Sequence, residues 1–298
     1  MARLTGPPGG VLTGLRETGE MIAFKHTVFA LPFAIISLIT AASPGWPTAH
    51  TWLWVAVAMV SARTAAMAFN RLADHRIDTE NPRTAGRALP AGRLSRNFAW
   101  AVTGISAGLF LFAAASLNSL CLVLAPPALA ILLGYSYAKR FTASSHLWLG
   151  LALGIAPVGA WIAVTGRIGW PALVLAGAVA LWVAGFDVIY SLQDEDFDRE
   201  HALHSLPARV GGGRALVIAR IFHLLAFAGF LAFALAAGGG PIRLLAVAAA
   251  GLLLAWQHRL IRADDLHSVN AAFFTANGTL ALAMCILFAV AQLIAAGI

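Results

Sequence analysis

Long apolar stretches recur along the whole chain and constrain its fold more than any other feature. Nine of them have about the 20 residues that an α-helix needs to cross a bilayer core. Only 11% of the 298 residues are charged and 60% are hydrophobic, too little polar surface for a soluble protein of this length. The sequence therefore predicts an all-α integral membrane protein with nine transmembrane helices in a single domain, 1–298, that includes a short N-terminal segment, 1–20. The predicted helices cover roughly residues 22–42, 50–70, 97–117, 119–138, 146–165, 170–191, 213–236, 241–261 and 270–295.

The basic residues alternate between the two ends of the predicted helices. The loops at one end contain most of them, whereas the opposite loops contain only Arg167 and Arg243. Since cytoplasmic loops carry the excess of Lys and Arg, we expect a multi-pass protein of the inner (plasma) membrane. The N-terminus and the basic loops would be cytoplasmic and the C-terminus outside. The net charge of +7 does not indicate a nucleic-acid partner, because the basic residues lie in short loops between apolar runs.

Acidic residues are concentrated at the same end of the predicted helices. Nine of the 13 lie in two segments, 74–80 and 187–200. In the first segment Asn70, Asp74 and Asp78 are spaced i, i+4, i+8, so they share one face if the helix continues past the bilayer. Pro82 disfavours a helical conformation at Asn81 and predicts the end of that helix.

The second segment repeats this arrangement at the end of the sixth predicted helix. Asp187, Asp194 and Asp198 fall within about 40° of one another at 100° per residue, and Tyr190 borders their stripe. Asp196 points to the far side, where we expect it to be solvated. Two facing stripes of carboxylates need cations, and oxygen ligands without clustered His or Cys suit Mg²⁺.

Arginines interleaved with these acids suit phosphate oxygens, which they can bind through two parallel hydrogen bonds. Together the acids and bases predict a site for a complex of Mg²⁺ and a diphosphate. The alternative is that the charges are interfacial anchors with local salt bridges. Two such segments occur in one chain, and Asp187 lies near the end of a membrane helix, where an acid is energetically costly. Both observations favour the site for Mg²⁺ and diphosphate.

At these residues the chain resembles the UbiA superfamily of intramembrane prenyltransferases. The family motif N-D-x-x-D-x-x-x-D corresponds to N-R-L-A-D-H-R-I-D at 70–78, and D-x-x-Y-x-x-x-D-x-x-x-D corresponds to D-V-I-Y-S-L-Q-D-E-D-F-D at 187–198. The stretches R-T-A-G-R-A-L-P-A-G at 83–92 and Y-S-Y-A-K-R, which ends at Arg140, match as well. The resemblance covers nearly the whole chain and implies the helical bundle of that family.

The resemblance also implies a reaction and a set of site residues. Family members bind a prenyl diphosphate through two Mg²⁺ ions and transfer the prenyl group to an acceptor, often an aromatic ring. The implied metal ligands are Asn70, Asp74 and Asp78 for one ion, and Asp194 and Asp198 for the other. The implied catalytic set is Asp74, Asp78, Asp187, Tyr190, Asp194 and Asp198. The implied binding set, for the diphosphate or for an acceptor carboxylate, is Asn70, Lys25, Arg63, Arg71, Arg83, Arg87 and Lys139.

Two departures from the family pattern indicate a branch. Arg71 stands where many members carry an acid, and His204 stands where several have lysine. Both resemble the 4-hydroxybenzoate polyprenyltransferase-like enzymes, including those of the futalosine route to menaquinone. We therefore expect Mg²⁺-dependent transfer of a polyprenyl group to 4-hydroxybenzoate or a similar acceptor, or to aminodeoxyfutalosine, in ubiquinone or menaquinone biosynthesis.

Other functions remain as alternatives at this stage. Haem O synthase and chlorophyll synthase are prenyltransferases of the same kind, and a membrane transporter is the rival from another class. A transporter would place its charges nearer the mid-plane of the membrane. The aromatic residues Phe69, Tyr135, Tyr137 and Tyr190 are candidates to face an allylic carbocation. The histidines, His146 among them, form no metal-binding spacing and are expected to be interfacial or packing residues.

Overall fold

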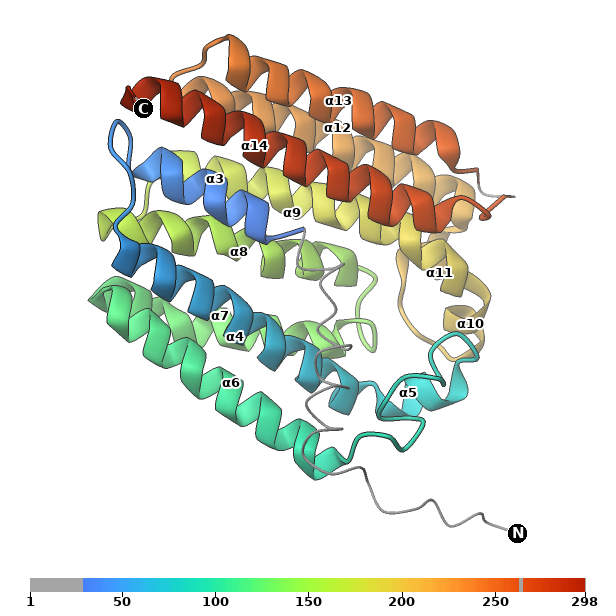
Figure 1. The fold of residues 1–298 in the computed structure, drawn as a ribbon. Coiled ribbons are helices and arrows are strands. Elements are labelled where there is room, and N and C mark those ends of the chain that lie inside the picture. Colours follow the sequence, from blue (N-terminus) through green and yellow to red (C-terminus); the bar gives the residue numbers. More distant parts are fainter. Residues whose placement is uncertain (1–28, 263–264, 298) are drawn as a thin grey trace.

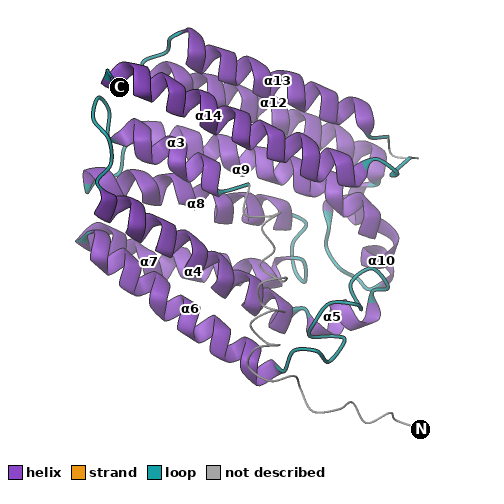
Figure 2. Ribbon diagram, in the orientation of Figure 1, coloured by secondary structure: helices purple, strands orange, loops and turns teal. Residues whose placement is uncertain are grey.

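A computed structural model describes residues 29–262 and 265–297. Every regular element in this part of the chain is a helix, and no strand occurs there (Figure 2). The long helices are α4 (Ala49–Ala73), α6 (Arg96–Leu117), α7 (Ser119–Ala138), α8 (Ser145–Thr165), α9 (Trp170–Ser191), α12 (Gly212–Ala236), α13 (Pro241–Leu260) and α14 (Asn277–Ala296). The shorter elements are α3 (Leu31–Ala41), α5 (His75–Glu80), η1 (Leu192–Asp194), α10 (Glu195–Glu200), α11 (Leu206–Val210) and η2 (Ala271–Ala276).

The predicted membrane spans correspond closely to these helices. Eight helices of the described chain are long and apolar enough to cross a membrane, η2 and α14 together forming the last of them. The ninth predicted run, 22–42, is described only from residue 29, and its described part contains the 11-residue apolar helix α3. The prediction of an all-α membrane fold is confirmed. The predicted N-terminal segment, 1–20, lies outside the described residues.

Helix α9 is the centre of the bundle and the most deeply buried of the spanning helices. It packs against α8 on one side and α12 on the other, as Figure 1 shows. Its buried side chains, led by Trp182 and Phe186, join residues of α3, α12, α13 and α14 in the largest core cluster. The outer faces of the other helices expose large apolar side chains such as Ile105 and Leu252, as lipid contact requires.

Small residues allow α8 and α9 to approach each other closely. Gly150 and Gly154 lie one turn apart on α8 and face the backbone of Ala180 and Ala176 on α9. A Cβ atom added at Gly154 would lie 2.7 Å from the carbonyl oxygen of Ala176, so only glycine fits there without a shift. Such small-residue contacts are a common way for membrane helices to pack without a hydrophobic driving force.

The three short helices α5, α10 and α11 lie together at one end of the bundle, whereas the C-terminus lies at the opposite end (Figure 1). Helix α5 follows α4 after a single residue, Asp74, and ends at Glu80. Asn81 is extended, as predicted for the residue before Pro82. Helix α9 continues through η1 into α10, so both acidic segments extend from spanning helices into this end of the molecule.

Candidate active site

The first acidic segment forms a compact polar turn where α4 passes into α5. The Asn70 amide donates a hydrogen bond to Asp74 Oδ2 over 2.8 Å. The backbone amide of Asp78 donates to the carbonyl of Asp74 over 2.7 Å, so the helical register runs through the break between the two helices. Asn70, Asp74 and Asp78 therefore share one face, as the i, i+4, i+8 spacing predicts.

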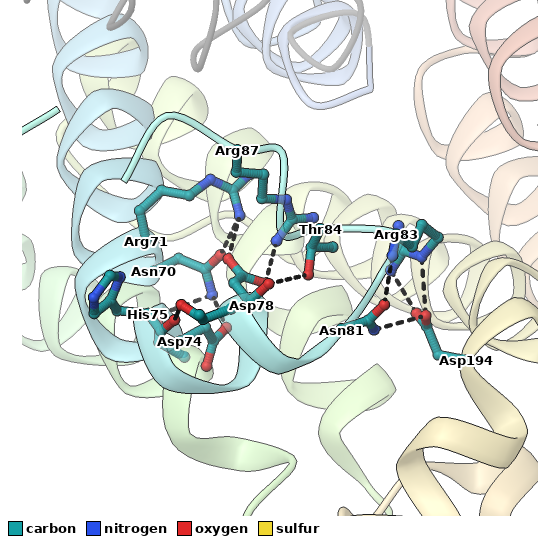
Figure 3. Close-up of polar contacts among 12 residues, drawn as sticks. Asn70, Arg71, Asp74, His75, Asp78, Asn81, Arg83, Thr84, Arg87 and Asp194 are labelled. Carbon is teal, nitrogen blue, oxygen red and sulfur yellow. Dashed lines mark hydrogen bonds and ion pairs between the residues drawn. The ribbon is translucent and has the colours of Figure 1, made fainter. Parts of the chain in front are cut away.

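Basic residues of the following loop and of α4 approach this face (Figure 3). Arg87 donates to Asp78 Oδ1 over 2.7 Å, and Arg71 lies 3.7 Å from Asp78 Oδ2. The Thr84 hydroxyl donates to the Asp78 carbonyl over 3.1 Å and secures the loop. Asp78 is only 5% exposed, and the two guanidinium groups supply the charge that a buried carboxylate requires.

The same loop contacts the second acidic segment. Arg83 binds Asp194 through two hydrogen bonds, of 2.9 Å from Nε and 2.5 Å from a terminal nitrogen. The Asn81 amide also donates to Asp194, and its own oxygen accepts from the Arg83 backbone amide over 2.9 Å. Arg83 further lies over the ring of Tyr190, 5.5 Å from its centroid. The loop after α5 thus connects both motifs, which are more than 100 residues apart in sequence (Figure 3).

A cavity of about 170 Å³ lies between the two motifs. All the predicted catalytic residues line it: Asp74, Asp78, Asp187, Tyr190, Asp194 and Asp198. Four of the seven residues of the predicted binding set line it too: Asn70, Arg83, Arg87 and Lys139. Tyr135 also belongs to its wall, so two of the four candidate aromatic residues face this space.

The remaining predicted residues lie elsewhere. Arg71 reaches the site through Asn70 and Asp78 but does not line the cavity, and Arg63 lies about two helical turns farther along α4 and does not line it either. Lys25 lies outside the described residues. Phe69 and Tyr137 do not line the cavity, since their rings pack edge to face against each other. Asp196 is a solvated bystander, as predicted, with a side chain that is 92% exposed.

Several residues of the site carry no individual assignment in the sequence interpretation. Asn81, Thr84, Ser136 and Arg140 line the cavity. Asn81 could have been recognised from its place before Pro82, since Asn favours turns in which its side chain bonds to the backbone two residues on. Arg140 donates to the carbonyl of Ala73, where α4 ends, and lies 3.4 Å from Asp74 Oδ1.

Like charges and burial act together on Asp74. Burial raises the pKa of the Asp74 carboxyl above its ordinary value, and the nearby Asp78 carboxylate raises it further, whereas Arg140 acts in the opposite direction. A cation that approached the two carboxylates would relieve this repulsion. Arg71, Arg87 and Arg140 already relieve part of it through their ion pairs with the two carboxylates.

The arrangement of oxygen atoms fits a hard divalent cation. Two buried carboxylate oxygens of residues that line the cavity, Asp78 Oδ2 and Asp198 Oδ2, have no hydrogen-bond partner among the described residues. Lys139 Nζ lies 3.9 Å from the latter. No three His, Cys, Asp or Glu side chains of the described chain converge closely enough to hold a metal ion by themselves. Because Mg²⁺ usually takes only one or two carboxylates and completes its shell from water and substrate phosphates, this donor set suits it.

Comparison with known proteins identifies the fold and the family. The sequence profile of the UbiA prenyltransferase family matches residues 30–294. A 4-hydroxybenzoate octaprenyltransferase of Vibrio vulnificus is 30% identical over 265 residues, which are 88% of this chain and 89% of the relative. A second 4-hydroxybenzoate octaprenyltransferase, from Nitrosospira multiformis, is 31% identical over 79% of this chain and 81% of its own.

Solved structures agree with the sequence relatives. The apo structure of a UbiA homologue from Aeropyrum pernix superposes with a TM-score of 0.79 at 35% identity, covering 93% of this chain and 99% of that one. A UbiA homologue from Archaeoglobus fulgidus, bound to DMAPP and Mg²⁺, shares the fold with a TM-score of 0.72 at 18% identity over 96% and 99% of the two chains. With the helical bundle and the two motifs, these matches show that the chain belongs to the UbiA prenyltransferase family and is a multi-pass membrane prenyltransferase.

Proposed function

We propose that this enzyme transfers a polyprenyl group from a polyprenyl diphosphate to an aromatic acceptor, in a Mg²⁺-dependent step of ubiquinone or menaquinone biosynthesis. One observation carries the proposal: the acids and bases of both motifs line a single cavity at one end of a membrane bundle. Acids that suit Mg²⁺ and bases that suit phosphate are together what a diphosphate substrate requires.

The metal ligands in this proposal are the carboxylates and the amide of the two motifs. Asn70, Asp74 and Asp78 would hold one Mg²⁺, and Asp194 and Asp198 a second. When bound, the ions supply Lewis-acid stabilisation of the negative charge on the departing diphosphate. The oxygens of Asp78 and Asp198 that accept no hydrogen bond among the described residues support this assignment.

Basic residues of the cavity bind the diphosphate. Arg83, Arg87 and Lys139 each face a carboxylate across the cavity and can exchange it for phosphate oxygens. Arg71 and Arg63 act from behind the cavity wall on α4, and Lys25 is assigned to the same binding set from its sequence alone. Cationic groups fixed in place before the reaction stabilise charge without rearranging as the allylic C–O bond breaks.

Other residues of the cavity stabilise the allylic cation and accept the proton that the acceptor loses. Tyr135 and Tyr190 present aromatic rings to the cation. The helices around the site exclude water, which would otherwise capture the cation. After the acceptor ring has bonded to the prenyl carbon, the ring must lose a proton. Asp187 lines the cavity and is the carboxylate outside the metal set, so we assign proton acceptance to it.

Two candidate acceptors belong to this proposal. The relatives with the matching sequences are named 4-hydroxybenzoate octaprenyltransferases, which supports 4-hydroxybenzoate. Arg71 and His204 depart from the usual family pattern and resemble the 4-hydroxybenzoate polyprenyltransferase-like branch, which includes enzymes of the futalosine route, so aminodeoxyfutalosine is the second candidate acceptor. Haem O and chlorophyll precursors fit those residues less well. A transporter is disfavoured, since the charged residues gather at one end of the bundle.

The positive-inside rule orients the enzyme in this proposal. The cavity and the basic loops face the cytoplasm across the inner (plasma) membrane, and the C-terminus lies outside. The polar acceptor and the diphosphate head group would then meet the cavity at the cytoplasmic side, while the prenyl chain extends between the helices toward lipid. The whole chain acts as one domain.

The test is a prenyl-transfer assay on the purified protein in detergent. A radiolabelled polyprenyl diphosphate is offered with 4-hydroxybenzoate or aminodeoxyfutalosine, with Mg²⁺ or with a chelator. We expect a lipid-soluble product only with Mg²⁺. Asp74→Ala and Asp194→Ala should abolish it, while Asp196→Ala, altered at the solvated position between the motif aspartates, should retain it.

Each result of this assay has a definite meaning. The acceptor that yields product identifies the branch. Transfer that persists in both aspartate variants with normal metal dependence would remove these residues from the Mg²⁺ role. Failure of the wild-type protein to bind the diphosphate at all would favour a transporter.

A further inference from the structure

A buried histidine that the proposed mechanism does not use contacts one of its carboxylates. His146 Nδ1 lies 2.6 Å from Asp187 Oδ2, although the residues are on different helices, α8 and α9. The side chain of His146 is almost completely buried, with 1% of the residue exposed. Packing or interfacial contact, the role expected for the histidines, does not require so short a polar contact with a cavity residue.

The second ring nitrogen determines the tautomer of His146. The backbone amide of Leu206, at the start of α11, donates to His146 Nε2 over 3.2 Å. An amide N–H can only donate, so Nε2 must be the unprotonated nitrogen. The proton of the neutral ring therefore lies on Nδ1, which donates to Asp187.

Helix packing maintains this contact. His146, Gly150 and Gly154 are spaced i, i+4, i+8 on one face of α8, and the two glycines contact the α9 backbone directly. Asp187 lies two turns beyond Ala180 on the antiparallel α9 and His146 one turn from Gly150 on α8, so the two side chains meet near the same end of this contact. The close approach of the two helices thus leads directly to the histidine–carboxylate pair.

We propose that His146 is a positioning residue that holds the Asp187 carboxylate in the orientation needed to accept the proton of the acceptor. The inference rests on the proposed function. Because His146 engages Oδ2, Oδ1 is the oxygen left for the substrate. The C–H bond of the prenylated ring breaks, its electron pair restores the aromatic system, and the proton forms an O–H bond with Oδ1.

The contact with Leu206 gives His146 a second role. Leu206 belongs to the segment that follows the second motif, and Leu203 of that segment lines the cavity. One imidazole ring therefore connects α8, the Asp187 carboxylate on α9 and the chain segment beside the cavity. An amide side chain reproduces only one of its two hydrogen bonds, which makes the two roles separable.

The experiment uses three variants of the full-length protein. In His146→Asn the amide nitrogen takes the place of Nδ1 and can still donate to Asp187, but the bond to Leu206 is lost. In His146→Gln the terminal amide takes the place of Nε2 and can still accept from Leu206, but the bond to Asp187 is lost. His146→Ala removes both. Each variant is assayed for kcat, for KM of the prenyl diphosphate and for thermal unfolding in detergent.

The expected pattern separates the effect of the hydrogen bond to Asp187 from that of the bond to Leu206. His146→Ala and His146→Gln should lose about 10- to 100-fold in kcat, the cost of misplacing a reacting group by up to 1 Å, with KM for the diphosphate unchanged. His146→Asn should keep kcat within a few-fold of wild type although its unfolding temperature falls. His146→Gln keeps the neutral hydrogen bond to Leu206 but loses the one to the Asp187 carboxylate, so it should be the less active of the two amide variants. Wild-type kcat in His146→Ala, or a kcat of His146→Asn as low as that of His146→Gln, would overturn the proposal.

A failure of the proposed function can be told apart from a failure of this inference. Wild-type protein that transfers prenyl groups to no acceptor would refute the function. The histidine assignment is then decided by NMR of protein labelled at histidine, with His146→Asn used to identify the resonance. An Nδ1–H tautomer whose proton resonance shifts in Asp187→Ala supports the contact, and an Nε2–H tautomer or an Nδ1–H resonance unchanged in Asp187→Ala overturns it.

Discussion

Replacement of Gly150 by alanine is expected to damage both the fold and the reaction. An added Cβ would overlap the carbonyl oxygen of Ala180 and would lie 2.9 Å from its carbonyl carbon and 3.1 Å from its Cα. Ordinary contacts begin at 3.4 Å, so the carbon alone requires a shift of at least 0.5 Å, the difference between 3.4 and 2.9. The obstacle is backbone, so no side-chain rotation can absorb the shift and α8 must move away from α9.

The magnitude follows from the cost of overpacking. Extra methyl groups in well-packed interiors typically cost about 1–3 kcal/mol. For domains of 150–250 residues this corresponds to roughly 2–4 °C in Tm per kcal/mol. The same displacement separates His146 from Asp187, which lie one turn and two turns from this contact. Since a misplacement of 1 Å can cost about 100-fold in rate, we expect kcat to fall about 10-fold or more.

The assay compares Gly150→Ala with Gly159→Ala on the same helix. Gly159 has nothing within 4 Å of the position where its Cβ would be, so alanine there should leave activity unchanged. It should stabilise the helix by up to about 1 kcal/mol, because glycine is the poorer helix former. Thermal unfolding in detergent and prenyl transfer are measured for both variants. Equal stability and equal turnover in the two would refute the packing argument.

Two further predictions concern individual polar contacts. Arg83→Lys cannot reproduce the paired hydrogen bonds to Asp194, and at about 1.5–3 kcal/mol per charged hydrogen bond it should lower kcat/KM roughly 10- to 100-fold. Arg76→Lys, at a side chain that is 90% exposed, is the matched control, and an equal loss there would contradict the assignment. Asn277→Leu removes the acceptor of the Trp182 indole N–H, 2.8 Å away and fully buried, and should destabilise the protein by about 1–3 kcal/mol. Unchanged thermal unfolding of that variant would show that the indole finds another partner.

Much of the site could be anticipated because its chemistry is local. The spacing of Asn70, Asp74 and Asp78 specifies one helical face whatever surrounds it, and Pro82 ends that helix wherever the chain is placed. The charge bias of the loops predicts that both acidic segments lie at the same end of the bundle. The structure brings these residues to one cavity. Their roles as metal ligands remain predictions.

Other parts of the site depend on which helices are neighbours. The placement of Phe69 and Tyr137 against each other, and of Tyr135 in the cavity, cannot be read from residue type, because any membrane aromatic can face lipid, core or substrate. Arg63 lies on the helix of the first motif but not at the cavity wall. Its place in the sequence gives its helix but not which face of that helix turns toward the cavity.

The sequence by itself determined the helices, their lengths and the end of the bundle at which charge gathers, since hydropathy and periodicity act over about 20 neighbouring residues. Only the tertiary structure decided that the loop at 81–87 joins both motifs, and that His146 meets Asp187 across 41 residues of sequence. These contacts arise from the packing of α8 on α9 and from the return of one loop across the cavity. Their physical cause is the steric fit between surfaces that are distant in the chain, which no local pattern encodes.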